Sequence, residues 1–163
     1  MRESDFISLH EIWHMKNNPM NALSNRIIFI LSLIGIAVAV YVLQSFIRQA
    51  SIVCVTTGCE VVRKSSVSYP FGIPVPAFGL VGYTLLALFA FLRTTTRETR
   101  NAKFFLHGML GISIFGVLFV SWFTYMEIFV IRGVCTWCAI SAVNMIAIFM
   151  LVLRSYLHQR DTI

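Results

Sequence analysis

Four long apolar stretches, separated by short polar segments, dominate the pattern of hydrophobic and polar positions along the chain. A helix needs about 20 mainly apolar residues to cross the hydrocarbon core of a membrane. Because no water is available there, a spanning segment must satisfy its backbone hydrogen bonds internally, as a helix does. We therefore predict four membrane-spanning helices, at residues 27–46, 75–92, 104–131 and 135–153.

The segments outside these stretches define the domain organisation. We predict an N-terminal tail over residues 1–26, a single four-helix membrane domain over 27–155, and a C-terminal tail over 156–163. The first apolar run is longer than the usual core of a signal peptide, and no small-residue cleavage pattern precedes Ser51. We expect that run to be kept as a membrane span.

The composition supports an all-α integral membrane protein. Of the 163 residues, 58% are hydrophobic and 12% are charged, and the mean hydropathy is +0.79. Soluble domains average about 45–50% apolar and about 25% charged residues. This apolar excess excludes a disordered chain, a collagen-like fibre and an ordinary soluble enzyme.

Lysine and arginine are shared unequally between the two sets of helix ends, nine against four. Because these residues concentrate in cytoplasmic segments, we expect a multi-pass protein of the inner cell membrane with both termini in the cytoplasm. The net charge of +6 then reflects the basic residues that set the membrane orientation, and we expect no nucleic-acid partner. The cytoplasmic set is Arg2, Lys16, Arg26, Arg93, Arg97, Arg100, Lys103, Arg154 and Arg160, and the opposite set is Arg48, Arg63, Lys64 and Arg132.

The four cysteines form two closely spaced pairs. Cys54 and Cys59 lie in the loop after the first span, and Cys135 and Cys138 open the fourth. With four spans, both pairs fall on the extracytoplasmic side, where disulfides form and persist. The C-x-x-C pair sits at a helix N-terminus, whose partial positive charge lowers the pKa of a thiol and so favours thiol–disulfide exchange.

Two pairs on one face predict a relay, in which the loop pair meets a protein partner and then exchanges with the membrane pair. Two inert structural disulfides and a four-cysteine zinc site remain as alternatives, although we expect no metal. A relay needs an electron acceptor, and no dinucleotide-binding or haem motif is present. A quinone needs only an apolar pocket between helices beside the reacting thiol.

Three stretches carry a more specific signal than the spacing of the cysteines. They are the loop segment 54–65, the segment 71–83 that leads into the second span, and the C-x-x-C segment 135–142. Together, in this order, they resemble the vitamin K epoxide reductase family, over residues 27–155. The resemblance implies a four-helix bundle with an outer loop that carries a short half-helix.

The resemblance also implies roles for the cysteines. Cys54 would face a separate thioredoxin-like partner, and Cys59 would carry electrons to Cys135. Cys138 would lie beside the quinone, which would be ubiquinone or menaquinone. The outcome would be a quinone-dependent oxidoreductase that generates disulfides in exported proteins.

The quinone pocket that the resemblance implies draws on five other residues. Ser65, on the half-helix, would form a hydrogen bond to a quinone oxygen. The remaining residues expected to bind the quinone are Phe71, Phe78, Tyr83 and Trp137.

The chain departs from the family pattern at two positions. Members that reduce vitamin K epoxide carry Asn and Tyr where this chain has Val75 and Ala142. These differences favour quinone reduction over epoxide reduction. Epoxide reduction and a non-catalytic scaffold with structural disulfides are the alternative functions.

Three further features need an interpretation. Residues 10–14 read H-E-x-x-H, but the short tail around them offers no zinc protease domain, so we interpret the match as chance. Glu127 is an ionisable residue inside a predicted span, for which a structural role and a role in proton transfer are both open. Gly79 and Gly82 are expected to permit close helix packing.

Overall fold

The computed structural model describes residues 19–48, 53–54, 58–95 and 99–160, and every regular element in them is helical. The long helices are α2 (Pro19–Arg48), α4 (Val75–Thr95), α5 (Thr99–Met126) and α6 (Thr136–Arg160). Each contributes a segment that is long and apolar enough to cross a membrane. The predicted fold class, an all-α integral membrane protein with four spans, is confirmed.

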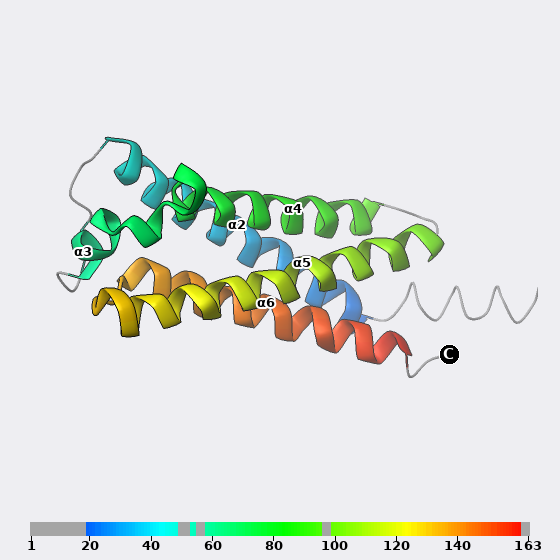
Figure 1. Ribbon diagram of the computed structural model, residues 1–163. Coiled ribbons are helices and arrows are strands. Elements are labelled where there is room, and N and C mark those ends of the chain that lie inside the picture. The colour runs from blue at the N-terminus through cyan, green and yellow to red at the C-terminus, as the bar shows by residue number, and fades with distance from the viewer. Residues whose placement is uncertain (1–18, 49–52, 55–57, 96–98, 161–163) are drawn as a thin grey trace, which may run out of the picture.

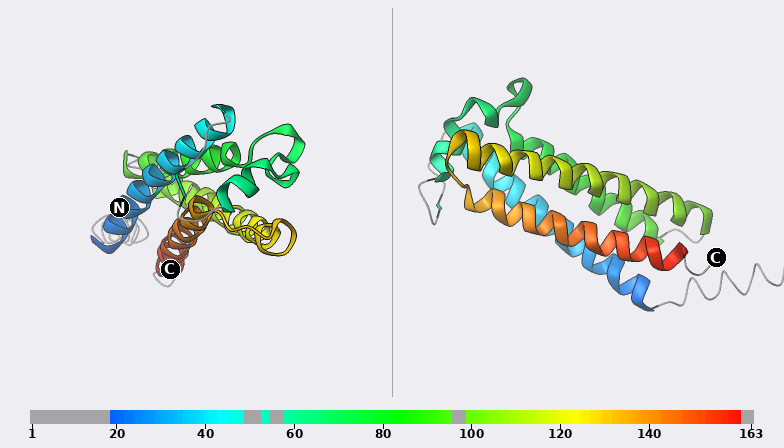
Figure 2. Two further views of the ribbon diagram at one scale, coloured as in Figure 1. Left: turned by 90° about the vertical axis from the view of Figure 1, so that its left-hand side faces the viewer. Right: turned by 60° about the horizontal axis from the view of Figure 1, so that its bottom comes forward.

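The four long helices pack as a bundle (Figure 1). Helix α2 contacts α4 and α6, and α5 contacts the same two helices from the other side. The C-terminal end of α6 lies at the opposite end of the bundle from α3, as the right-hand view in Figure 2 also shows. The fold therefore gathers the loop between α2 and α4 and the turn between α5 and α6 at one end.

Short helices cover that end. They are α3 (Gly58–Lys64), η1 (Ser66–Ser68) and η2 (Pro70–Gly72), and α5 continues as a π-helical turn, η3 (Glu127–Ile131). The short half-helix that was predicted in the outer loop is present as α3. We refer to this end of the molecule as the α3 end.

The helices extend beyond the predicted apolar windows. The apolar spans run over Ala22–Arg48, Val75–Thr95, Lys103–Ile131 and Thr136–Arg160. Hydropathy marks the part of a helix that faces hydrocarbon, whereas the hydrogen-bonded backbone continues into polar flanking residues. The H-E-x-x-H segment at 10–14 lies outside the described residues.

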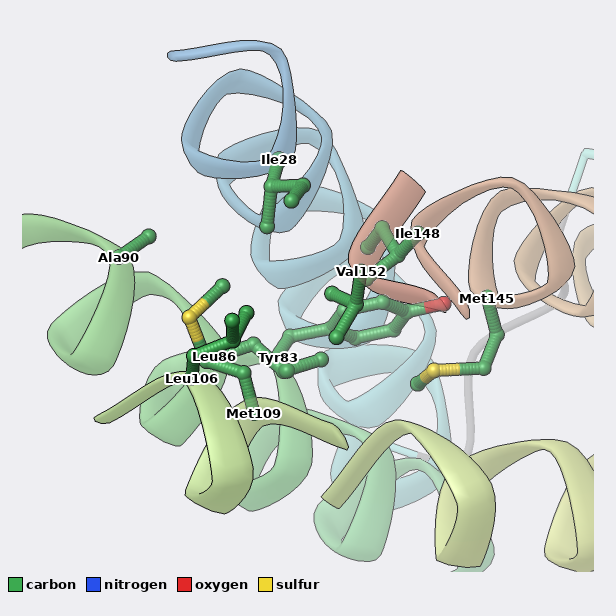
Figure 3. Close-up of a cluster of buried hydrophobic side chains, with 9 residues drawn as sticks. All are labelled: Ile28, Tyr83, Leu86, Ala90, Leu106, Met109, Met145, Ile148 and Val152. Atoms are coloured by element: carbon green, nitrogen blue, oxygen red, sulfur yellow. The ribbon is translucent and has the colours of Figure 1, made fainter. Parts of the chain in front are cut away.

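A cluster of nine buried side chains, contributed by all four long helices, packs inside the bundle (Figure 3). Tyr83 extends from α4 across the interior toward α6, where its hydroxyl donates to the backbone oxygen of Ser141 at 2.8 Å. A Cβ at Gly35 of α2 would lie 2.5 Å from the Tyr83 ring, so this glycine lets the ring pack against the α2 backbone. The members of the cluster are Ile28, Tyr83, Leu86, Ala90, Leu106, Met109, Met145, Ile148 and Val152.

Candidate redox site

The two cysteine pairs are in different redox states. Cys54 and Cys59 form a disulfide with their Cα atoms 6.4 Å apart, whereas Cys135 and Cys138 are free thiols. The loop pair is therefore oxidised and the helix pair reduced. A disulfide between Cys54 and Cys59 also withdraws two of the four thiolates that a four-cysteine zinc site needs.

A close backbone contact brings the two pairs together. A Cβ at Gly58 would collide with the backbone of Val134, so only glycine allows α3 to approach the turn before α6 this closely. The next residue in each segment is a cysteine, Cys59 and Cys135. Both are buried in one cluster with Phe123. The thiol pair and the disulfide therefore lie side by side at the α3 end.

Cys135 occupies the N-cap position of α6, since its carbonyl oxygen accepts the first helical hydrogen bond, from Ala139 N–H at 3.0 Å. An N-cap side chain can accept from the unpaired N–H groups of the first turn. A hydrogen bond from the Cys138 side chain, assisted by the backbone N–H groups of Cys138 and Trp137, lowers the pKa of Cys135 from about 9 to about 7. Cys135 is thus primed to react as a thiolate near neutral pH.

Glu127 lies against the two thiols. The ligand atoms of Glu127, Cys135 and Cys138 all lie within 4.8 Å of one another. Glu127 is 1% exposed, and its Oε1 has no hydrogen-bond partner. Among the described residues, these three side chains also form the group that is close enough to hold a metal ion.

An apolar cavity of about 630 Å³ extends from the thiols into the bundle. Its walls come from all four long helices and from α3. Cys59, Cys135 and Cys138 line one part of it, and Tyr83 and Met145 line the part next to the packed core. Cavities of roughly 300–1,000 Å³ lined mainly by apolar side chains are the usual size for small-molecule sites.

A comparison with protein families matches residues 26–153 to the vitamin K epoxide reductase family. The chain belongs to that family. Membership makes the protein a membrane oxidoreductase whose chemistry uses cysteines, in a family that uses quinones. A comparison with functionally curated proteins found no match.

Within this vitamin K epoxide reductase fold, three of the five expected quinone-binding residues line the cavity, namely Phe78, Tyr83 and Trp137. Ser65 does not line it. Its Oγ instead accepts from Val67 N–H at 3.3 Å and caps η1, directly after α3. The side chain of Phe71 lies outside the described part of the chain.

Trp137 links the fourth span to the loop that carries the disulfide. Its indole Nε1 donates to the carbonyl oxygen of Val53 at 3.0 Å, next to Cys54. Its ring also packs on Tyr41 of α2, with ring centroids 4.9 Å apart. Trp137 therefore contacts the cavity, α2 and the redox loop at once.

The prediction for Gly79 and Gly82 is wrong. A Cβ at either position would meet no atom within 4 Å, and both glycines line the cavity. Here the missing side chains leave the cavity open instead of bringing two helices into contact. The same holds for Gly111 of α5.

Some lining residues of this vitamin K epoxide reductase family member were not predicted from the sequence. Ser141 lines the cavity one helical turn after Cys138 and holds the hydroxyl of Tyr83. Phe115, Phe119 and Phe123 line it from α5. Their regular spacing of four residues places them on one helix face and is the signal that could have identified them.

Proposed function

We propose that the protein oxidises the dithiol of a separate thioredoxin-like protein and passes the electrons to a quinone. In this proposal Cys54 and Cys59 receive the electrons first, and Cys135 and Cys138 receive them second. The observation that carries it is an apolar cavity with both free thiols in its wall and the Cys54–Cys59 disulfide beside them.

The contacts of the cysteines support the following order of thiol exchange. The partner's thiolate attacks Cys54, and the partner leaves oxidised once its second thiol has released it, which reduces the loop pair to two thiols. Cys59 then attacks an oxidised Cys135–Cys138 pair at Cys135, because these two cysteines are buried in one cluster. Cys54 resolves the mixed disulfide, so the loop pair becomes oxidised and the helix pair reduced.

The cavity fits a quinone by its chemistry. A bound quinone would accept two electrons and two protons from the helix pair and leave as a quinol. Apolar walls suit the ring and the chain of such a lipid, and the few polar atoms include the hydroxyl of Tyr83 and the side chain of Ser141. Val75 also lines the cavity and offers no polar side-chain atom, so we do not propose epoxide reduction.

Activity with purified protein tests this function. We expect detergent-solubilised protein to couple dithiothreitol oxidation to reduction of a short-chain benzoquinone, and Cys138→Ala to abolish that coupling. Ser113→Ala is the matched control, because Ser113 is buried in α5 but does not line the cavity. Equal activity in Cys138→Ala and the native protein would contradict the proposal and favour the scaffold.

We also propose that the α3 end faces the extracytoplasmic side and that both termini lie in the cytoplasm. The excess of basic residues at the opposite end supports this orientation. In intact cells, a membrane-impermeant maleimide should label a cysteine substituted for Lys64, which is exposed at the α3 end. A cysteine substituted for Arg160 should be labelled only after the membrane is permeabilised. The reverse result would overturn the orientation.

A further inference from the structure

Among the described residues, Glu127 is the acidic side chain grouped with the two free thiols, and the proposed relay does not use it. Its ligand oxygen lies within 4.8 Å of both thiol sulfurs. The carboxyl group is within hydrogen-bonding reach of the Cys138 side chain and of the Cys135 backbone. An acidic side chain in contact with a reacting atom can act on it directly.

The local backbone aims this side chain at the start of α6. The regular turns of α5 end at Met126, and a π-helical turn follows over Glu127–Ile131. That turn ends at Arg132 in the left-handed conformation, with φ at 54°, and Gly133 N–H donates to the Glu127 carbonyl at 3.1 Å. Single π-helical turns are frequent at functional sites, because the extra residue rotates the side chains that follow it.

One carboxyl oxygen of Glu127 lacks the hydrogen-bond partner that a purely structural role would supply. Glu127 is 1% exposed, and its Oε1 forms no hydrogen bond. No ion pair to it is formed by the described basic side chains. Buried polar atoms are nearly always paired, and an acidic residue inside a membrane segment usually serves function.

The titratable and charged groups of the elements next to Glu127 include Arg132, which ends η3 and is exposed. From α6, the titratable groups that face it are Cys135 and Cys138. From α3, which packs against η3, Arg63 Nη2 donates to Glu60 Oε2 at 2.7 Å, and Lys64 is exposed. A proton that leaves Cys138 therefore meets Glu127 as its neighbouring acceptor.

We propose that Glu127 is the catalytic base and acid for the Cys138 thiol. Its carboxylate takes the proton from Cys138 as the thiolate forms and would release it to a quinone oxygen as the quinone is reduced to the quinol. As the Cys135–Cys138 disulfide forms, two electrons and two protons leave the thiol pair. The second proton comes from Cys135, and Glu127 ends the cycle unchanged. The identity of the electron acceptor in this step, a quinone, rests on the proposed function.

Turnover with dithiothreitol and a short-chain benzoquinone gives the first test. We expect Glu127→Gln to lower the rate by on the order of 10²–10⁴-fold, the usual contribution of a general acid or base. It should also remove one limb of the pH–rate profile, whereas Glu127→Asp should keep that limb. Ser113→Ala, a buried polar residue of the same helix, is the control and should behave like the native protein.

A second test does not depend on any quinone. In a reduced Cys135→Ser parent, which removes the thiol that is also coupled to Cys138, Cys138 and Glu127 titrate together, so the alkylation of Cys138 by iodoacetamide should show two steps as the pH rises. Added to this parent, Glu127→Gln should show one step, and Glu127→Asp two. If Glu127→Gln kept the two-step profile of the parent, the inference would be overturned. If the native protein reduced no quinone, the proposed function would fail while this test still applied.

Discussion

Gly58 lies so close to the backbone of Val134 that no larger residue fits between α3 and the turn before α6. The contact joins two segments that are far apart in the sequence, and each is followed by a cysteine of the site. The disulfide and the thiol pair are thus held together by backbone packing next to the sulfur atoms. The reach of Cys59 toward Cys135 depends on this contact.

Gly58→Ala should therefore reduce exchange between the two pairs. In a Cys54→Ser, Cys138→Ser background, Cys59 and Cys135 are the remaining thiols of the site and should form a mixed disulfide. We expect Gly58→Ala to lower its yield, because the added methyl group pushes α3 away from Val134. Mass spectrometry of the cross-linked peptide measures the yield. Gly111→Ala, at a position with open space, is the control. An equal loss of cross-linked product in both variants would show that the Gly58–Val134 contact does not control the exchange.

The reactivity of Cys135 should depend on pH in the neutral range. Because the thiolate is the reactive form and the pKa of Cys135 is lowered to about 7, its alkylation should rise with a midpoint near pH 7 and level off above it. The hydrogen bond from Cys138 is the largest cause of the low pKa, so Cys138→Ala should move the midpoint upward. Peptide mass spectrometry after timed exposure to iodoacetamide gives the profile. An unchanged midpoint in Cys138→Ala would show that the helix N-terminus alone sets the pKa.

Filling the cavity should impair acceptor binding without damaging the fold. Gly82→Leu places a side chain in open space inside the cavity, so we expect a higher KM for a short-chain benzoquinone and an unchanged thermal unfolding midpoint. Leu88→Phe, on the exposed face of the same helix, is the matched control. A KM in Gly82→Leu equal to that of the control would mean that the acceptor binds elsewhere.

The hydroxyl of Tyr83 should contribute measurably to stability. It bonds the backbone oxygen of Ser141 at 2.8 Å and lies 3.0 Å from the Ser141 Oγ. Tyr83→Phe should lower the free energy of unfolding by about 1 kcal/mol, since the Ser141 groups lose a buried partner. Denaturation in detergent measures the change. Tyr125→Phe, whose side chain is exposed, should have no such effect, and a similar loss there would point to a general effect of the substitution.

Hydropathy was sufficient to predict the fold because each membrane span can be recognised from its own sequence. A run of apolar residues marks a membrane helix without reference to any other part of the chain. The position of Cys135 at the start of a helix could also be predicted, since C-x-x-C coincides with the beginning of the fourth apolar run. Features that depend only on neighbouring residues, such as these, can be predicted from the sequence.

The cavity could not be predicted from the sequence in the same way, because its walls come from four helices and depend on how those helices pack. Gly79 and Gly82 show the difficulty. Small residues on a membrane helix usually indicate close packing, yet here they border open space. The contact between Gly58 and Val134 is likewise tertiary, and nothing in either local sequence indicates it. Ser65 shows the same limit, since its hydroxyl caps a turn instead of lining the cavity.

Tyr83 and Met145 belong both to the packed cluster and to the cavity wall. Beyond them, side chains such as Leu86, Leu106 and Ile148 are fully buried and form a mainly apolar plug. The buried Ser32 and Ser113 in the bundle donate to backbone oxygens of their own helices. Protons and ions do not cross such a plug readily, because a bare charge in hydrocarbon-like surroundings is very costly. A redox cycle of the proposed kind, confined to the α3 end, would therefore exchange electrons and protons at one membrane surface while the bundle stays an insulator between the two compartments, so it would not dissipate the transmembrane proton gradient.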